Sequence, residues 1–436
     1  MDTDPIPAGV LAEALERVAR PGWERFSEML SHTGGCARPV RLKGNTRRAD
    51  PDTGELALSY DSADEPDGVL LKACQSRRST RCPACAATYR SDARALILAG
   101  LVGGKGMPEE VAAHPLVFVT LTAPSFGPVH NEHDSCHPKP MDCPCGQPHL
   151  CLETHEAGVA LIGRPLCPDG YDYPGVILWN NRATELWRRT TIATRRHLAG
   201  LLGTTVRSFD RYHRLAYVKV VEYQARGLIH IHALIRLDPI ATSPTPTDSA
   251  ALAAAVVAAV TKASAPNPIP RGPAIRWGTR NQVDVVAVDG RQCLAGYLAK
   301  YTVKSVDAGG ALDHRLHRAE LDRLVLDDHL YRLVKTCWDL GGDARLADCR
   351  LREWTHALGF RGHWLTKSPN WSTSLTSLRQ ARHDYQLVRA GTRPEGIVLA
   401  EWKYAGSGHL NEGDAWLARS EARSRYLNRR TAWEER

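Results

Sequence analysis

"RLAYVKVVEYQARGLIHIHALIRL", residues 214–237, contains two apolar runs joined by Ala225, Arg226 and Gly227. Both runs are rich in β-branched and aromatic residues, which favour strands. A short connection that contains glycine is typical of a hairpin turn, and we expect Gly227 to supply backbone angles that other residues rarely adopt. The sequence therefore predicts two antiparallel strands here.

Two histidines, His230 and His232, lie two residues apart in the second run. Because side chains alternate along a strand, both project from one face, while Ile229, Ile231 and Ala233 project from the opposite, buried face. Neutral imidazole is the commonest metal ligand, so the pair can chelate one cation. The alternative is two ordinary polar positions of a half-exposed strand.

Glu222 is the candidate third ligand of this site. It lies in the first run, across the turn from the histidines, so its carboxylate can come alongside His230 and His232. Gln224 is a competing third ligand, and an exposed strand glutamate with no metal is the other alternative.

Two tyrosines and two lysines recur at helical spacing in "CLAGYLAKYTVKS", Cys293–Ser305. Tyr297 and Tyr301 are four residues apart, as are Lys300 and Lys304, so on a helix each pair shares a face with about 6 Å between its members along the axis. Two tyrosines at this spacing are more often packing residues of a core or surface than catalytic residues. A helix carrying both pairs in the same domain as the histidine strand is a candidate catalytic element.

The remaining patterns predict an α+β protein with an antiparallel sheet. Further strands are expected at Leu116–Thr122 and Gln282–Asp289, a long helix around Trp179–Leu202, and an alanine-rich helix at Ala250–Ala265 that Asp248 or Ser249 can cap. We expect three regions: 1–105, helical with a cysteine-containing stretch; 106–310, the strand-rich domain with a Cys/His-rich insertion at about 130–172; and 311–436, helical and basic.

Charge and hydropathy limit the class of protein. The 436 residues carry 56 Lys+Arg against 48 Asp+Glu, a net charge of +8 that is compatible with a nucleic-acid partner. The longest aliphatic run is too short for a membrane span, and the amino terminus does not resemble a signal peptide. We therefore expect a cytoplasmic protein with no membrane partner. In that reducing compartment its twelve cysteines favour thiolate ligands or buried thiols over disulfides.

The cysteines predict structural zinc at one or two sites. A first set contains the CxxC pair Cys82 and Cys85 with Cys74 and Cys36 upstream, and reduced thiols are its alternative. The insertion contains a larger set of possible ligands: Cys136, His137, Cys143, Cys145, His149, Cys151, His155 and Cys167. The combination we favour for a second zinc is Cys143 or Cys145 with Cys151, His155 and Cys167.

Three segments, in this order, carry a family resemblance: "FVTLTAPS" (118–125), "HIH" (230–232) and "YLAKY" (297–301). They resemble motifs I, II and III of rolling-circle replication initiators, the HUH endonucleases. "ILWNNRATELWRRT", "VEYQARGLIHIHALIRLD" and "LGFRGHWLTKS" are similar to actinobacterial initiators of the RepSA type, which plasmids and integrative conjugative elements carry. The resemblance extends from about residue 35 to about residue 383.

The resemblance implies a ferredoxin-like or RRM-like HUH domain, with the histidine strand central in the sheet and the tyrosine helix laid against it. Position by position, His230 and His232 match the paired metal ligands, Tyr297 the nucleophile, Lys300 the lysine that follows it, and Tyr301 the second tyrosine of two-tyrosine members. The implied cofactor is Mg²⁺ or Mn²⁺. Similar proteins carry "CPDCYDY" where this chain has "CPDGYDY", so a CxxC at 167–170 is missing here.

The implied activity is nicking and rejoining of single-stranded origin DNA through a covalent 5′-phosphotyrosine, followed by host helicase and polymerase. A transposase or relaxase of the same superfamily is the nearest alternative, although relaxases place the tyrosine near the amino terminus. A histidine phosphoesterase would need a further HxT/S or a third histidine, whereas Ala233 and Leu234 follow His232. A non-catalytic, zinc-containing DNA-binding regulator is the third alternative.

Overall fold

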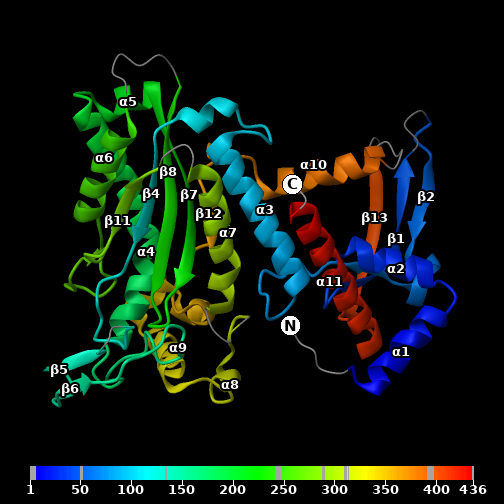
Figure 1. Ribbon diagram of the computed structural model, residues 1–436, viewed down its shortest axis with the longest axis horizontal. Helices are drawn as coiled ribbons and strands as arrows, with labels where there is room; N and C mark the ends of the chain where they lie inside the picture. Colours follow the sequence, from blue (N-terminus) through cyan, green and yellow to red (C-terminus); the bar gives the residue numbers. More distant parts are fainter. Residues whose placement is uncertain are drawn as a thin grey trace. The chain divides into compact units, whose positions relative to one another are not determined.

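The computed structural model describes residues 6–49, 53–132, 135–240, 247–286, 290–308, 312, 314–389 and 397–434. The chain forms two compact units (Figure 1): a first unit of Met1–Asp92 with Leu375–Arg436, and a second unit of Ala93–Ser374. This division differs from the three regions predicted with boundaries at 105 and 310, because the last part of the chain returns to pair with the first. Among the described residues, no helix is both long and apolar enough to cross a membrane.

The second unit is built on a five-stranded antiparallel sheet with the order β11-β4-β8-β7-β12. The strands are β11 (Gln282–Val285), β4 (Leu116–Leu121), β8 (Ile229–Pro239), β7 (His213–Tyr223) and β12 (Leu365–Lys367). The predicted α+β class and the hairpin β7–β8 are confirmed, and the histidine strand β8 is the middle strand. Residues 287–289 of the predicted strand at 282–289 lie outside the described residues.

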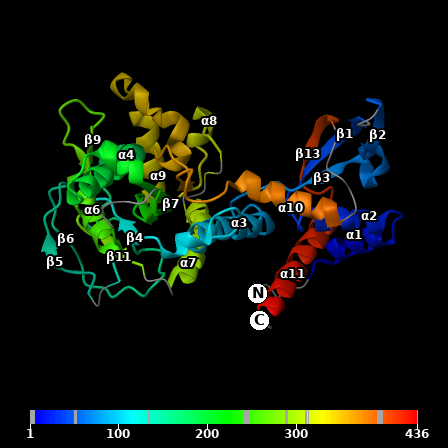
Figure 2. The same ribbon diagram turned by 90° about the horizontal axis from the view of Figure 1, so that it is seen from above.

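The two faces of this sheet differ because strand side chains alternate. Ile229, Ile231 and Ala233 are buried with the helices α4 (Tyr173–Leu201) and α6 (Ser249–Lys262), as predicted from the alternation. Asp248 caps α6 by accepting a hydrogen bond from the Ala251 amide at 2.8 Å. The helix α7 (Arg291–Ala308) packs on the opposite face, so the sheet lies between α4 and α6 on one side and α7 on the other (Figure 2).

A buried side chain of α4, Asn180, fixes the β7–β8 turn. Its Nδ2 donates to the carbonyls of Gly227 at 2.9 Å and Leu358 at 3.2 Å, and its Oδ1 accepts from the amide of Ile229 at 3.1 Å. Gly227 has φ +82° and a Cβ there would lie 2.5 Å from a methyl group of Leu333, so this position requires glycine for both backbone and space. The amide of Asn180 thereby holds the end of the turn where β8 begins and links it to Leu358.

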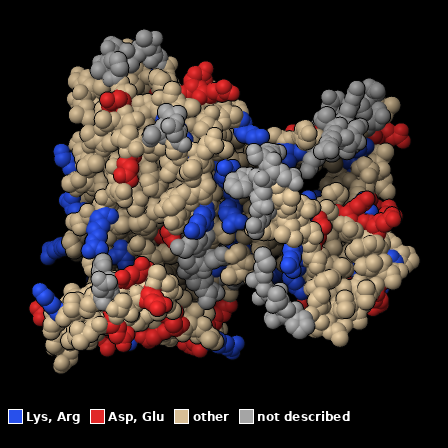
Figure 3. Space-filling view, in the orientation of Figure 1, with Lys and Arg blue, Asp and Glu red and all other residues tan. Residues whose placement is uncertain are grey.

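The rest of the second unit covers the sheet and extends from it. Its elements are the last part of α3 (Pro83–Val102), β5 (His137–Met141), β6 (His149–Cys151), α5 (Val206–Tyr212), β9 (Ser264–Ala265), β10 (Ile275–Arg276), α8 (Arg318–Leu321) and α9 (Asp328–Leu340). Acidic side chains gather at the end that carries β5, β6 and α9 (Figure 3). Ion pairs of Arg164 with Asp327 at 2.6 Å and of Arg332 with Asp169 at 2.7 Å connect the insertion to α9 there.

The first unit joins the two ends of the chain. It contains α1 (Ala8–Ala19), α2 (Trp23–His32), β1 (Val40–Ala49), β2 (Leu56–Asp61), β3 (Leu70–Lys72), α10 (Leu375–Arg389), β13 (Val398–Ser407) and α11 (Glu412–Glu434). The strand β1 pairs with β2, β3 and β13, all antiparallel. The helical C-terminal region predicted for 311–436 therefore needs a correction, since β12 pairs with β7 and β13 with β1.

We predict that Asn180→Ala lowers the free energy of unfolding of the second unit by about 3 kcal/mol, because it leaves the carbonyls of Gly227 and Leu358 and the amide of Ile229 without that buried partner. Urea denaturation followed by tryptophan fluorescence measures the change. Asn428→Ala, at an exposed position of α11, is the control and should stay within about 0.5 kcal/mol of the parent. Equal effects of the two substitutions would contradict the role of Asn180.

Candidate active site and metal-binding groups

The predicted site residues share one face of the sheet. In the ladder, Glu222 of β7 is directly opposite His230 of β8, and Thr120 of β4 is directly opposite His232. The period of two along each strand places all four side chains on the face that α7 covers. The sheet register thus brings together residues that are more than 100 positions apart in the sequence.

His232 lies at the centre of a cluster of rings and is almost fully buried. Its ring centroid is 4.7 Å from that of His230, 4.8 Å from Tyr301 and 5.7 Å from Tyr297. Phe118 of β4 stacks on His232 at 5.9 Å and meets the edge of Tyr297 at 5.9 Å. Both tyrosines of α7 therefore face the histidine strand.

The two tyrosines differ in their surroundings. The Tyr301 hydroxyl donates a hydrogen bond to Tyr297 Oη at 3.1 Å. Burial and this bond raise the pKa of Tyr301, so it stays protonated near neutral pH. Tyr297 is 42% exposed and accepts that hydrogen bond. Of the pair, Tyr297 is the phenol that a substrate can reach.

The histidines and Glu222 offer donors for a cation. His232 Nε2 is 3.8 Å from Glu222 Oε2, while His232 Nδ1 is hydrogen-bonded to Thr120 Oγ1 at 3.3 Å, which orients the ring. His230 Nδ1 is buried without a hydrogen-bond partner among the described residues. Burial lowers the pKa of His230 to about 4, so its imidazole is neutral and able to ligate at pH 7. The donor set fits a divalent cation.

The fit is looser than that of the cysteine groups. Within the described part of the chain, three groups have at least three ligand atoms that all lie within 4.8 Å of one another, and His230, His232 and Glu222 do not form one of them. The competing ligand Gln224 is engaged elsewhere, since its Oε1 accepts from Arg226 Nε at 2.8 Å.

Some residues at this site were not predicted as site residues. Thr120 and Phe118 lie within the predicted strand at 116–122, and the alternation of that strand was the available signal for their shared face. A cavity of about 340 Å³ borders Glu222 and is also lined by Arg164 and His329, for which no sequence signal existed. Lys300, in contrast, was predicted; it lies exposed on α7 between the two tyrosines.

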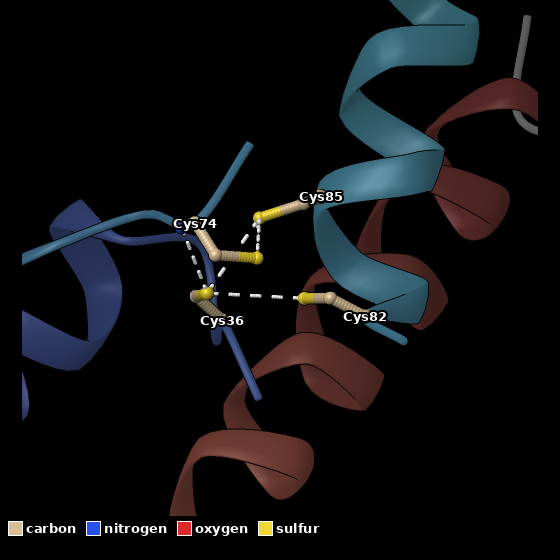
Figure 4. A group of neighbouring side chains, drawn as sticks. All are labelled: Cys36, Cys74, Cys82 and Cys85. Atoms are coloured by element: carbon tan, nitrogen blue, oxygen red, sulfur yellow. Dashed lines mark hydrogen bonds between the residues drawn. The ribbon is translucent and has the colours of Figure 1, made fainter. Parts of the chain in front are cut away.

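Four cysteines gather in the first unit as predicted: Cys36, Cys74, Cys82 and Cys85 (Figure 4). Sγ of Cys36 is 3.8 Å from that of Cys82 and 3.6 Å from that of Cys85, and Cys74 Sγ is 3.7 Å from Cys85 Sγ. Ligands on a tetrahedron with Zn–S bonds of about 2.3 Å are about 3.8 Å apart. This group therefore has the spacing of a structural zinc site.

The ligand set predicted for the insertion is wrong. Cys151 and His155 lie with His130 and Cys136, whereas Cys143 and Cys167 lie with Cys145 and His149. The physical reason is the β5–β6 hairpin, in which His137 pairs with Cys151 and Met141 with His149. Cys136 and Cys151 are thus at its open end, and the cysteines of its loop are at the other end. The predicted combination mixed the two ends.

Comparisons with known proteins agree on one family. The family model described as RepSA, the replication initiator protein of pSAM2, matches residues 22–423. A replication initiator protein from Streptomyces ambofaciens is 41% identical over 450 residues, which cover 97% of this chain and 95% of that protein. No solved structure matches the chain.

We predict that Cys85→Ser removes one zinc ion per chain and lowers the melting temperature of the first unit, because a lost thiolate opens the tetrahedral site. Inductively coupled plasma mass spectrometry of the purified protein gives the zinc content. Cys293→Ser changes an exposed thiol outside all three groups and should leave it unchanged. Unaltered zinc in Cys85→Ser would rule this group out as a site.

Proposed function

The chain belongs to the RepSA family of replication initiator proteins, and we propose that it starts rolling-circle replication by nicking and rejoining origin DNA at the site on β8 and α7. The observation that carries the proposal is the exposed Tyr297, whose hydroxyl accepts a hydrogen bond from Tyr301 and whose ring meets that of His232 edge-on. The replicon is a plasmid or an integrative conjugative element of an actinobacterium. In this proposal the chain is an HUH endonuclease, and the central position of the histidine strand in an antiparallel sheet supports that proposal.

Tyr297 is the nucleophile in this proposal. Its Oη attacks the scissile phosphorus, a P–Oη bond forms and the P–O3′ bond breaks. The phenol gives up one proton and the departing 3′-oxygen takes one, so no proton is consumed overall. The products are a 5′-phosphotyrosine and a free 3′-hydroxyl, and attack by a 3′-hydroxyl reverses the reaction without an energy source. The free 3′-end is the primer that host polymerase and helicase require.

Tyr301 positions and activates Tyr297 in the first transfer. Its hydroxyl donates to Tyr297 Oη, and its own raised pKa makes it the weaker nucleophile of the two. Once Tyr297 is esterified, Tyr301 no longer has a phenolate to stabilise. It can then serve as the acceptor in a second transfer that ends a round of replication. Lys300, exposed beside both tyrosines on α7, adds positive charge for the phosphate.

His230, His232 and Glu222 would hold the divalent cation. When bound, that ion acts as a Lewis acid that polarises the scissile phosphate. Two imidazoles in the donor set suit Mn²⁺ better than Mg²⁺, which prefers oxygen ligands. Thr120 fixes the His232 ring for this role through the bond to Nδ1.

The cavity beside Glu222 suits single-stranded DNA. Leu330, Leu333 and Leu358 give it an apolar wall, and Arg164 brings a guanidinium. A flanking base can lie on such a wall while its phosphate approaches the cation. A non-catalytic DNA-binding regulator does not require a neutral His230, whose Nδ1 has no hydrogen-bond partner among the described residues, beside a pair of tyrosines. These features favour a nicking enzyme over a regulator.

We predict that Tyr297→Phe abolishes the covalent protein–DNA adduct, because no other exposed phenol lies on this face of α7 among the described residues. The protein is incubated with Mn²⁺ and with labelled, overlapping single-stranded oligonucleotides that cover both strands of the DNA next to its coding sequence. The products are then separated on a denaturing gel. Tyr385→Phe, at an exposed tyrosine of α10, is the matched control and should keep the adduct. An adduct that survives in the Tyr297→Phe/Tyr301→Phe double variant would falsify the nucleophile assignment.

We further predict that His232→Ala lowers the cleavage rate at least about 100-fold in saturating Mn²⁺ while DNA binding, measured by fluorescence anisotropy, changes little. Thr120→Val should raise the Mn²⁺ concentration needed for half-maximal rate about 10-fold, since it removes only the bond that orients His232. Cleavage by His232→Ala at the parental rate would contradict the metal site.

A further inference from the structure

We propose that the insertion holds two separate metal ions, most simply Zn²⁺, in addition to the ion in the first unit. The first, at the open end of the β5–β6 hairpin, is held by His130, Cys136, Cys151 and His155; we call it the open-end site. The second, at the loop of the hairpin, is held by Cys143, Cys145, His149 and Cys167; we call it the loop site. The proposal of these two metal sites does not depend on the proposed nicking activity.

The open-end site has the spacing of a tetrahedral Cys₂His₂ centre. His155 Nε2 is 3.4 Å from Cys151 Sγ and 3.1 Å from His130 Nδ1, and Cys136 Sγ is 3.7 Å from that same His130 nitrogen. With Zn–N bonds of about 2.0 Å and Zn–S bonds of about 2.3 Å, such ligand atoms are about 3.3–3.8 Å apart. Cys136 and His155 are buried, so this site is closed as structural zinc sites are.

The loop site is a Cys₃His group. Cys145 Sγ is 3.1 Å from His149 Nε2 and 3.7 Å from Cys167 Sγ. Cys145 and His149 come from the hairpin, whereas Cys167 lies beyond it near the start of α4. A metal ion here ties the loop of the hairpin to the end of the insertion.

The insertion needs such links because it lacks an apolar core. Of its described residues from 135 to 170, Cys136 and Cys167 are the buried hydrophobic ones. Large apolar side chains of the same segment are exposed: Met141, Leu150, Leu152, Val159 and Leu161. A segment that buries so little apolar surface requires cross-links to hold one conformation, and metal ions are the means available to reduced cysteines.

The fourth ligand of the loop site is Cys143, whose sulfur lies close to Gly170. A Cβ on Gly170 would lie 2.1 Å from Cys143 Sγ and 3.6 Å from Cys167 Sγ. The first distance is close to a carbon–sulfur bond length, so a cysteine at 170 could place its sulfur almost where Cys143 places its own. Cys143 thus provides the thiolate that a cysteine at position 170 could provide. The loop site therefore has four ligands although the chain has glycine at position 170.

The metal ions also support the cavity at the candidate active site. The Tyr171 hydroxyl donates to the carbonyl of Arg226 in the β7–β8 turn at 2.9 Å, and Arg164 lines the cavity that borders Glu222. Both residues follow the loop of the hairpin in the insertion. Loss of either metal ion would therefore allow residues that line this cavity to move. This consequence rests on the proposed function, whereas the two metal sites do not.

The first test is the zinc content of the folded, purified wild-type chain, measured by mass spectrometry after loosely bound zinc has been removed by desalting. We expect three ions per chain, two in Cys136→Ala, two in Cys145→Ala and one in the double variant. Cys293→Ser is the control and keeps three. One zinc ion or none in the wild type would overturn the proposal. A wild type with two zinc ions that loses both when a single ligand in the insertion is replaced would overturn it as well.

The second test moves a ligand. Cys143→Ala should drop the content to two ions, and adding Gly170→Cys to that variant should restore three, because the new sulfur falls near the vacated position. Gly170→Ser in the same background supplies the Cβ without the thiol and should stay at two. No loss in Cys143→Ala, or equal content in the cysteine and serine double variants, would exclude Cys143 and position 170 as equivalent ligand positions. Zinc content does not involve DNA, so its failure is separable from failure of the nicking proposal.

Discussion

The register of the β7–β8 hairpin is the constraint on which the candidate site depends. A slip of one residue would turn every side chain of β8 to the other face, placing the histidines in the core and Ile229 and Ile231 under α7. The apolar face disfavours that slip, and Asn180 further restricts it by binding the Gly227 carbonyl and the Ile229 amide where β8 begins. Glu222 faces His230 because of that register.

Local pattern was sufficient for the long elements of the second unit, the strands β4, β7, β8 and β11 and the helices α4, α6 and α7. Alternation in β7 and β8, the glycine of the turn and the Asp248 cap each act over a few residues, so the sequence alone indicates them. Pairings between distant segments carry no such signal. The strand β13 has an alternating pattern but was assigned to a helical region, and each of its residues pairs with a residue of β1 at least 350 positions away. The ligand set predicted for the insertion was wrong for a related reason. Which cysteines lie together depends on where the short β5–β6 hairpin turns, and the sequence does not show that position.

The candidate site combines neutral groups that water would otherwise solvate. Burial keeps His230 unprotonated and Tyr301 protonated, so the two groups are in the forms that donate a lone pair and a hydrogen bond, respectively. Phe118 excludes solvent from the other side of His232. The sequence predicted the identities of the histidines and tyrosines, whereas their protonation follows from packing that only the folded sheet and α7 create.

The pairing of β1 with β13 also determines when the first unit can finish folding. The first unit consists of Met1–Asp92 and Leu375–Arg436, and the whole second unit is encoded between them. During synthesis the amino-terminal segment emerges early but cannot acquire its third strand partner until the ribosome has passed residue 398. A chain released early would carry an intact second unit on an unfinished first one. The first unit therefore completes its sheet only after the whole second unit has been synthesised.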